Sequence, residues 1–225
     1  MLQEGAATRP SLGRAGPGSH RTPHSFLMDD QSMATAPTGP RESILDAAMH
    51  LFGKQGYTGT SMRDIANAVG VLPGSLYAHI ASKEALLVEI VDDGIQRFLG
   101  AAQPHVAGSG SADARLRAMI VAHVEVVADN PERSLVVFHQ WRFLGPDNIE
   151  FAVQKRREYE NAFVTVVDEG RAGGLFRKDL DLRIGVRTLL GALNWTPEWL
   201  SSKGRLSPAQ VGAAMADTLL GGLLA

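Results

Sequence analysis

Apolar residues recur at helical spacing along nearly the whole chain after residue 40. In the first such run, the apolar positions fall at i, i+4, i+7 and i+8: Ile44, Ala48, Leu51 and Phe52. Side chains with this spacing lie on one face of an α-helix. Gly56 follows the run, at the kind of position where a left-handed residue commonly ends a helix. The pattern predicts an amphipathic helix that ends at Gly56.

A second and a third helix are predicted close behind the first. The second carries the next apolar stripe: Met62, Ile65, Ala66 and Val69. Ser61 and Asp64 have the S-x-x-D spacing of a capping box at its start, and Gly70 stops it. Pro73 suits the first position of the third helix, because an N–H there would be unpaired anyway. Short amphipathic helices joined by a tight glycine turn are typical of a helix-turn-helix, although an ordinary three-helix bundle has the same spacing.

The helical pattern continues to the end of the chain. Ser82 is placed to cap a long helix, and further helices are predicted over 112–129, from Asn130-Pro131 through "LVVFHQWRFL", and over 147–171. Another covers 181–200 with an interruption at Pro197, and Ser207 with Gln210 forms a capping box that opens the last one. Alternating strand patterns of useful length are absent from the sequence. The predicted fold class is all-α.

The first 40 residues differ in composition from the rest. They are rich in Gly, Pro, Ser and Thr and have no periodicity, so they cannot bury enough apolar surface to offset chain entropy. We expect residues 1–40 to be a disordered extension, residues 41–85 a helix-turn-helix domain, and residues 86–225 a larger helical domain. The extension is interpreted either as a DNA-touching arm with Arg9, Arg14 and Arg21, or as an extended start with Met28 or Met33 as the true initiator.

Composition limits the classes of function. Apolar residues make up 44% of the chain, and a formal net charge of −2 gives no global preference for nucleic acid or membrane. DNA binding would therefore depend on a few placed cations. Cysteine is absent, which excludes disulfides, thiolate metal sites and a cysteine nucleophile. No apolar run reaches the ~18 residues of a membrane span, and the expected location is cytoplasmic.

Enzyme motifs are missing as well. The sequence has no nucleophile elbow, no H-E-x-x-H and no P-loop, and histidines such as His50, His105 and His123 are scattered without ligand spacing. We therefore expect no catalytic residues, no metal site and no cofactor other than a small-molecule effector. The expected protein is not an enzyme.

The stretch "ILDAAMHLFGKQGYTGTSMRDIANAVGVLPGSLYAHIASKEALL", residues 44–87, resembles the DNA-binding domain of the TetR family of regulators. The shared landmarks are "LFGKQGY", "TSMRDIANAVGV", "GSLY" and "SKEALL", in this order and at these spacings. The resemblance implies an N-terminal three-helix helix-turn-helix domain that binds double-stranded DNA, followed by a C-terminal helical domain for ligand binding and dimerisation.

The resemblance also implies which residues lie near DNA. Some of them contact the phosphates and set the register, while few read the bases. The expected set is Thr60, Arg63, Leu72, Pro73, Gly74, Ser75, Tyr77, His79 and Lys83. Leu72 departs from the family, which usually has a Ser or Thr cap there; a leucine instead suits contact with a thymine methyl group. Tyr77 has a second interpretation as a core ring with only its hydroxyl at the surface, and Lys83 has one as a solvated first-turn residue.

The last helix, "PAQVGAAMADTLLGGLLA", carries a single charge, Asp217, and is apolar nearly all round. A helix of this kind must be covered on more than one side. The helix before it, "LRIGVRTLLGALNWTPEWL", has a similar content of small residues. One interpretation is that the two helices form a deeply buried pair within a monomer. The other, which the resemblance favours, is a four-helix interface between the two copies of a homodimer that reads a palindromic operator.

The segments "DEGRAGGLFRKDLDL" and "LLGALNWTPEWL" resemble the TetR subgroup that controls fatty-acid or sterol-ring catabolism and responds to acyl-CoA thioesters. Basic residues would pair with CoA phosphates and apolar residues would surround the acyl chain. The candidate ligand-binding residues are Val137, Phe138, Trp141, Arg142, Lys155, Arg156, Arg157, Phe163 and Trp195. Alternatively, the basic residues form a solvated helix face and the tryptophans are ordinary core residues.

The sequence thus predicts a homodimeric repressor that a small apolar ligand, best an acyl-CoA thioester, releases from its operator. Two alternatives stay open. One is a TetR-type repressor that senses a drug or another apolar molecule. The other is a degenerate member that dimerises without binding DNA, for which Leu72 would be the evidence.

Overall fold

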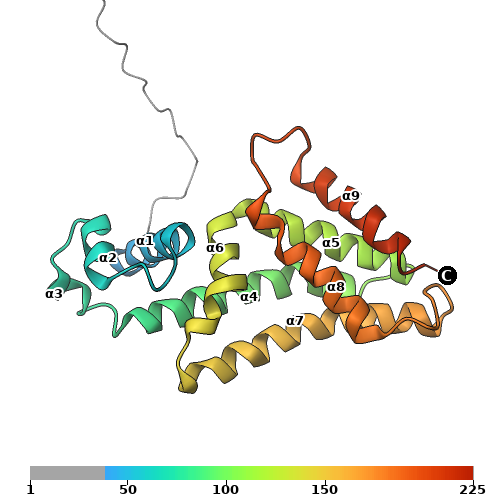
Figure 1. Cartoon of the computed structure of the whole chain (residues 1–225), viewed down its shortest axis with the longest axis horizontal. Coiled ribbons are helices and arrows are strands. Elements are labelled where there is room, and N and C mark those ends of the chain that lie inside the picture. Colours follow the sequence, from blue (N-terminus) through green and yellow to red (C-terminus); the bar gives the residue numbers. More distant parts are fainter. Residues whose placement is uncertain (1–38, 225) are drawn as a thin grey trace, which may run out of the picture. The chain divides into compact units, whose positions relative to one another are not determined.

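The computed structural model describes residues 39–224, which fold into helices joined by short loops (Figure 1). The predictions for residues 1–38, including the arginine arm, lie outside the described residues. Residues 39–224 contain no β-strand, and a single isolated β-bridge joins Phe176 to Leu224. The predicted all-α class is confirmed.

The elements are α1 (Pro40–Gln55), α2 (Met62–Val69), α3 (Pro73–Leu76), α4 (Lys83–Val106), α5 (Ala112–Asp129), α6 (Pro131–Leu135), η1 (Val136–Gln140), η2 (Trp141–Phe143), α7 (Pro146–Ala172), α8 (Leu182–Asn194), η3 (Thr196–Glu198) and α9 (Pro208–Gly221).

Several helices begin or end at the capping residues that the sequence predicts. The Ser61 hydroxyl accepts a hydrogen bond from the backbone N–H of Asp64, and the Asp64 carboxylate accepts one from the backbone N–H of Ser61 at 2.8 Å. Gly70 has φ 73° and ψ 28°, a left-handed conformation that glycine adopts without steric cost. Ser82 and Ser207 cap α4 and α9 through their hydroxyls. These predicted caps are confirmed.

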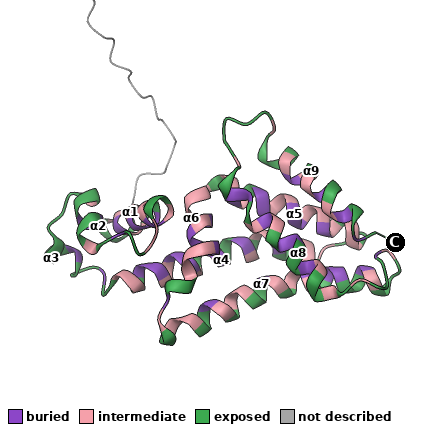
Figure 2. Cartoon of the chain, viewed as in Figure 1, coloured by how far each residue is buried: buried purple, intermediate pink, exposed green. Residues whose placement is uncertain are grey.

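Helices α1, α2 and α3 form a small head at one end of the long helix α4. Its core includes the fully buried side chains of Phe52, Ile65 and Leu76. Helix α3 is a single turn, after which the chain continues in turns as far as His79. Leu72 stands at its N-cap position and makes no side-chain cap bond. The head is thus anchored from inside, while the α3 turn lies largely at the surface (Figure 2).

The remaining helices pack around α4 and α5. Figure 1 shows α4 running from the head into this bundle, where it packs on α5 and α7, while α8 packs on α7 and α9 lies along α5. Two glycines permit close approach. A Cβ on Gly94 would lie 2.2 Å from Cγ2 of Val137, and one on Gly212 would lie 2.8 Å from Cα of Val121. Among residues 39–224, no helix has the length and apolar character that crossing a bilayer requires.

The helix expected from Asn130 through "LVVFHQWRFL" is not regular. Pro131–Leu135 is α-helical, Val136–Gln140 forms a π-helical turn, and Trp141–Phe143 is a 3-10 turn. A π turn holds an extra residue relative to an α-helix and often occurs at functional sites. Here it buries Val137 and Phe138 while Gln140 still accepts a hydrogen bond from the backbone N–H of Tyr57 at 3.0 Å. The segment therefore contacts the bundle and the head at once.

Candidate nucleic-acid interface and ligand cavity

The turn around α3 presents a continuous exposed surface. Leu72 is 77% exposed and Tyr77 is 56% exposed, whereas Leu76 and Ile80 point inward and are buried. The exposure of Tyr77 excludes the interpretation of its ring as a core residue. The other residues expected near DNA on this surface are also exposed: Arg63, Pro73, Gly74, Ser75 and His79. These side chains are free to contact a molecule that docks on α2 and α3.

Lys83 and Thr60 have internal contacts. The Lys83 ammonium donates to the backbone carbonyls of Tyr57, at 2.9 Å, and Thr60, at 2.8 Å. It also lies 4.2 Å from the centre of the Tyr57 ring, a cation–π contact. Thr60 is only 2% exposed, and its hydroxyl donates to the carbonyl of Gly56 at 2.9 Å. The expectation for Thr60 needs correction, because its buried side chain offers no surface to a phosphate and instead fixes the loop that Lys83 holds.

A cavity of about 330 Å³ lies between α4, the π turn, α7 and α8. Its wall is apolar on the side of α4 and η1 and carries charged or polar groups from α7 and α8. The lining residues are Ile95, Phe98, Val137, Phe138, Trp141, Val153, Arg156, Arg157, Tyr159, Glu160, Arg187, Leu190, Gly191 and Asn194. This combination suits a ligand with an apolar body and an anionic group.

Arg156 is a half-buried cation of the cavity wall that lacks an ion-pair partner in the described part of the chain. Its guanidinium donates to the carbonyl of Val137 at 3.3 Å, and no ion pair joins it to a carboxylate among residues 39–224. The nearby carboxylate of Glu160 is paired with Arg187 at 3.1 Å. Burial, and secondarily the charge of Arg142, lowers the pKa of Arg156 to about 10, while Glu160 acts in the opposite direction. A half-buried cation in this state favours an anionic group of a ligand in the cavity.

Two guanidinium groups hold the Trp141 ring. Those of Arg142 and Arg156 each lie 4.9 Å from the ring centre. Arginine stacks well on aromatic faces because its planar cation is weakly hydrated. The orientation of Trp141 on the cavity wall is therefore fixed by its charged neighbours.

A buried polar pair adjoins the cavity. Nδ1 of His123 lies 2.8 Å from the hydroxyl of Tyr159, and the imidazole is stacked on Phe138 with ring centres 5.6 Å apart. Burial lowers the pKa of His123 to about 3, so the ring is neutral at physiological pH. Burial likewise raises the pKa of Tyr159, which keeps its proton. The pair is a neutral hydrogen-bonded contact between α5 and α7.

Five of the nine predicted ligand-binding residues line the cavity, and four do not. Those on the wall are Val137, Phe138, Trp141, Arg156 and Arg157. The Arg142 guanidinium lies 4.9 Å from the centre of the Trp141 ring but does not line the cavity, and the Lys155 ammonium lies 3.5 Å from the Glu158 carboxylate. Phe163 is buried in the core, and Trp195 is 57% exposed. The structure therefore corrects the predicted set, because these four side chains face other surroundings.

The sequence interpretation missed the part of the wall that α8 supplies. Arg187, Leu190, Gly191 and Asn194 fall at i, i+3, i+4 and i+7, which places them on one helix face. That spacing is visible in the sequence. What it does not indicate is that this face borders a cavity instead of the core.

Comparison with known proteins identifies the family of the chain. Residues 44–90 match the family described as bacterial regulatory proteins, tetR family, and residues 109–223 match the tetracyclin repressor-like C-terminal domain. The chain belongs to the TetR family. The resemblance inferred from the sequence is confirmed, and so is the expectation of a regulator in place of an enzyme, because the relatives are transcriptional regulators.

Several TetR relatives cover most of the chain. The HTH-type transcriptional repressor KstR2 of Mycolicibacterium smegmatis is 28% identical over 188 residues, which are 83% of this chain and 92% of that protein. The ketosteroid transcriptional regulator KstR2 of Mycobacterium tuberculosis has a similar structure, with a TM-score of 0.77, 25% identity, and coverage of 85% of this chain and 98% of that one. AibR, in complex with isovaleryl coenzyme A and operator DNA, has a TM-score of 0.72, 26% identity, and coverage of 79% and 96%.

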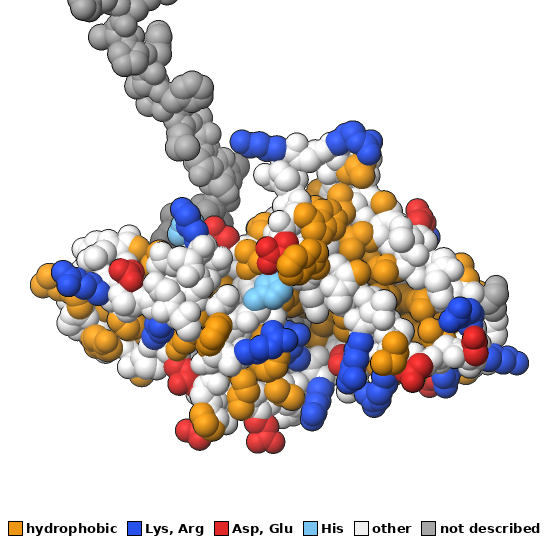
Figure 3. All heavy atoms as spheres, in the orientation of Figure 1, with side chains coloured by type: hydrophobic (Ala, Val, Ile, Leu, Met, Phe, Trp, Pro, Cys, Tyr) orange, Lys and Arg blue, Asp and Glu red, His pale blue; other side chains and the backbone are white. Residues whose placement is uncertain are grey.

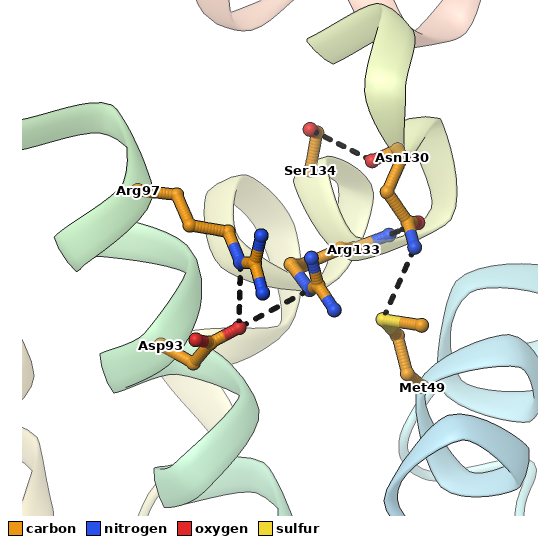
Figure 4. Close-up of polar contacts among 6 residues, drawn as sticks. All are labelled: Met49, Asp93, Arg97, Asn130, Arg133 and Ser134. Carbon is orange, nitrogen blue, oxygen red and sulfur yellow. Dashed lines mark hydrogen bonds and ion pairs between the residues drawn. The ribbon is translucent and has the colours of Figure 1, made fainter. Parts of the chain in front are cut away.

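In this TetR regulator, polar contacts join α6 to α4 of the bundle and to α1 of the head (Figure 4). The Asp93 carboxylate on α4 lies 2.9 Å from Nε of Arg97 and 3.5 Å from Nε of Arg133 on α6. Asn130 donates to the sulfur of Met49 on α1 at 3.6 Å and caps α6 by accepting from the N–H of Arg133 at 2.8 Å. Helix α6 thus contacts both α4 and α1, and the π turn that follows it forms part of the cavity wall.

Proposed function

We propose that this TetR-family protein is a homodimeric repressor that an acyl-CoA thioester releases from a palindromic operator. Family membership supplies the class of regulator. The effector, the dimer and the individual contact residues are the parts that we propose.

The exposed turn from Leu72 to His79 supports operator binding in the major groove. Gly74 adds no side chain between backbone and base edges, and the nearby Tyr77 hydroxyl suits a phosphate oxygen. Because the net charge of the chain is −2, attraction to DNA has to come from cations placed near this turn, such as Arg63. Leu72 contributes an apolar contact instead of a helix cap, which favours a thymine in the operator.

The half-buried guanidinium of Arg156, which has no ion-pair partner among the described residues, is the observation that carries the proposed effector. An apolar cavity beside such a cation favours a ligand that brings both hydrocarbon and negative charge. An acyl-CoA thioester has this composition, with an apolar chain at one end and phosphates at the other. A cavity of about 330 Å³ suits the acyl part, and Arg157 and Arg187 lie on the same wall to pair with anionic groups of the remainder. The similar structure of AibR, which contains isovaleryl coenzyme A, also supports an acyl-CoA effector.

Uncovered apolar surface on α8, α9 and the segment between them supports a second copy of the chain as partner. Ile184 is 60% exposed and Trp199 is 50% exposed, and hydrophobic side chains are visible over this region in Figure 3. A groove on this surface is lined by Ala192, Trp199, Leu206, Val211, Ala214, Met215, Thr218 and Leu219. A two-fold interface would cover the same patch on both copies and place two heads for a palindrome. Met215→Glu should then yield monomers in sedimentation analysis, and an unchanged mass would remove this interface.

The test is fluorescence anisotropy of the purified protein on DNA from upstream of its own coding sequence. Acyl-CoA thioesters of short, long and steroid type are titrated into the complex, with free CoA as control. Release at micromolar thioester and none with free CoA is the expected result. Tight binding that no thioester disturbs would keep the repressor and remove this effector class. If the protein is a dimer but binds no DNA fragment from this region, the result would favour the alternative of a TetR-family member that dimerises without binding DNA.

A further inference from the structure

Two buried polar atoms on the cavity wall lack hydrogen-bond partners within residues 39–224. They are Nε1 of Trp141 and Oδ1 of Asn194, and both residues line the same cavity. Buried polar groups are nearly always paired, because an unpaired one loses its hydration without replacement. Two such atoms on one wall indicate hydrogen bonds that a ligand completes.

The two atoms differ in what they require. An indole N–H only donates, whereas an amide oxygen only accepts. Trp141 cannot easily turn its N–H elsewhere, because its ring is held by the guanidiniums of Arg142 and Arg156. Asn194 is the last residue of α8, so its backbone position is fixed by that helix. The ligand must therefore present an acceptor to Trp141 and a donor to Asn194.

A secondary amide carries both functions in one planar group. Its carbonyl accepts and its N–H donates, while a carboxylate offers acceptors only and a hydrocarbon chain offers neither. We propose that the cavity recognises a secondary amide of its ligand, with the amide carbonyl bound by Trp141 and the amide N–H bound by Asn194. This inference rests on the proposed function, since the pantetheine arm of an acyl-CoA contains secondary amides next to the thioester. It makes the arm, and not only the acyl chain or the phosphates, a determinant of selectivity.

Three matched probes without phosphates test the recognition directly. They are S-octanoyl-N-acetylcysteamine, which contains one secondary amide, its N-methylated form, which lacks the donor, and its ester analogue, in which oxygen replaces the N–H. Calorimetry on the full-length wild-type protein gives their Kd values. We expect the secondary amide to bind about ten-fold more tightly than either analogue, because each analogue leaves Asn194 unpaired. Equal affinities for the three probes, or no binding of any of them, would overturn the inference.

Variants test the two contacts separately. Trp141→Phe keeps an aromatic ring beside the two guanidiniums but removes the indole N–H with its five-membered ring, and Asn194→Ala removes the side-chain amide. In Asn194→Ala the preference for the secondary amide should fall toward one, while affinity for the ester analogue stays near that of the wild type. In Trp141→Phe all three probes should bind more weakly, because each of them carries the carbonyl, and the preference for the secondary amide should remain. Asn161→Ala is the matched control, because Asn161 is exposed on α7 and does not line the cavity. Retention of the full preference in Asn194→Ala, or unchanged affinity for all three probes in Trp141→Phe, would overturn the assignment.

Release of operator DNA by octanoyl-CoA separates this inference from the proposed function. Release by octanoyl-CoA without discrimination among the three probes would leave the function standing and overturn the amide contact. Discrimination among the probes without release by any thioester would support the amide contact and overturn the acyl-CoA effector.

Discussion

The Lys83 ammonium lies 2.9 Å from the carbonyl oxygen of Tyr57 and 4.2 Å from the centre of the Tyr57 ring. The next residue, Glu84, accepts hydrogen bonds at the start of α7, from the N–H of Gly145 at 2.9 Å and from Asn148 at 2.8 Å. These bonds, that of Asn148 foremost, hold the pKa of Glu84 below its ordinary value. Adjacent residues of α4 therefore contact the head on one side and the start of α7 on the other.

Replacing Lys83 by Met should weaken operator binding through the position of the head. Loss of the charged hydrogen bonds to Tyr57 and Thr60 should lower the free energy of unfolding by about 1–2 kcal/mol. We expect operator affinity to fall about ten-fold or more. Urea unfolding and anisotropy measure the two effects. Lys178→Met, at an exposed site outside the head, is the control. Unchanged stability with weakened DNA binding would indicate that Lys83 acts on phosphate alone.

Arg63→Ala and Tyr77→Phe should both weaken operator binding but differ in salt dependence. Removal of a cation that contacts phosphate lowers the slope of log K against log salt by about 1, since one fewer counterion is released. The phenol carries no charge, so Tyr77→Phe should reduce affinity at every salt concentration with an unchanged slope. Anisotropy titrations between low and moderate salt distinguish the two. Identical slopes for Arg63→Ala and wild type would place Arg63 away from the phosphates.

The double variant Arg156→Ala plus Arg157→Ala should respond poorly to acyl-CoA while still binding its operator. Both side chains are on the cavity wall, and Lys155 on the same helix is not. Lys155→Ala is therefore a matched control with an expected wild-type response. Because Arg156 is half-buried and forms no ion pair with a carboxylate of residues 39–224, its removal should not lower the free energy of unfolding substantially. A wild-type response to acyl-CoA in the double variant would mean that Arg156 and Arg157 form a solvated helix face and do not bind the ligand.

Stability should decrease as the pH falls below the ordinary pKa of histidine, because of His123. Its pKa is about 3 in the folded protein and 6.5 in the unfolded chain, so between these values the unfolded state binds more protons. The folded state then loses about 1.4 kcal/mol per pH unit from this group. In His123→Gln the contribution is absent. Urea unfolding at pH 7, 6 and 5 should therefore show a steeper decline for the wild type, and parallel declines would contradict the assignment.

Gly94→Ala should destabilise the protein by about 1–3 kcal/mol, the usual cost of overpacking. The added methyl group would lie 2.2 Å from Cγ2 of Val137, so α4 would have to move away from the π turn. Gly100, on the same helix, has nothing within 4 Å of an added Cβ. Gly100→Ala should therefore stabilise the protein by about 0.5–1 kcal/mol. Thermal unfolding of the two variants should shift in opposite directions.

Helix ends were predicted correctly from the sequence where nearby capping residues determine them. The box of Ser61 with Asp64 and the left-handed Gly70 depend on residues within one or two turns, so the sequence contains all that is needed. Lys83 is different. Its acceptors are backbone carbonyls of the loop at residues 57–60, and only the packing of α4 against that loop brings them within reach.

The cavity was only partly predictable for a related reason. Asn194 and Trp195 are neighbours, but the first lines the cavity and the second is 57% exposed. Which of them faces inward depends on how α8 is rotated against α7, a tertiary relationship. The π turn likewise forms where Gln140 meets the backbone of Tyr57, at a separation of 83 residues. No local pattern in the sequence encodes that contact.

The π turn makes the length of its segment matter as well as its composition. Val137 and Phe138 border the cavity, and Gln140, in the same turn, bonds the head. Deleting one residue there would restore α-helical register and rotate everything beyond it by about 100°. Gln140 would leave Tyr57, and Trp141 would leave the wall. Substitutions can vary the chemistry of this segment, whereas an insertion or deletion would disconnect the cavity from the DNA-binding head.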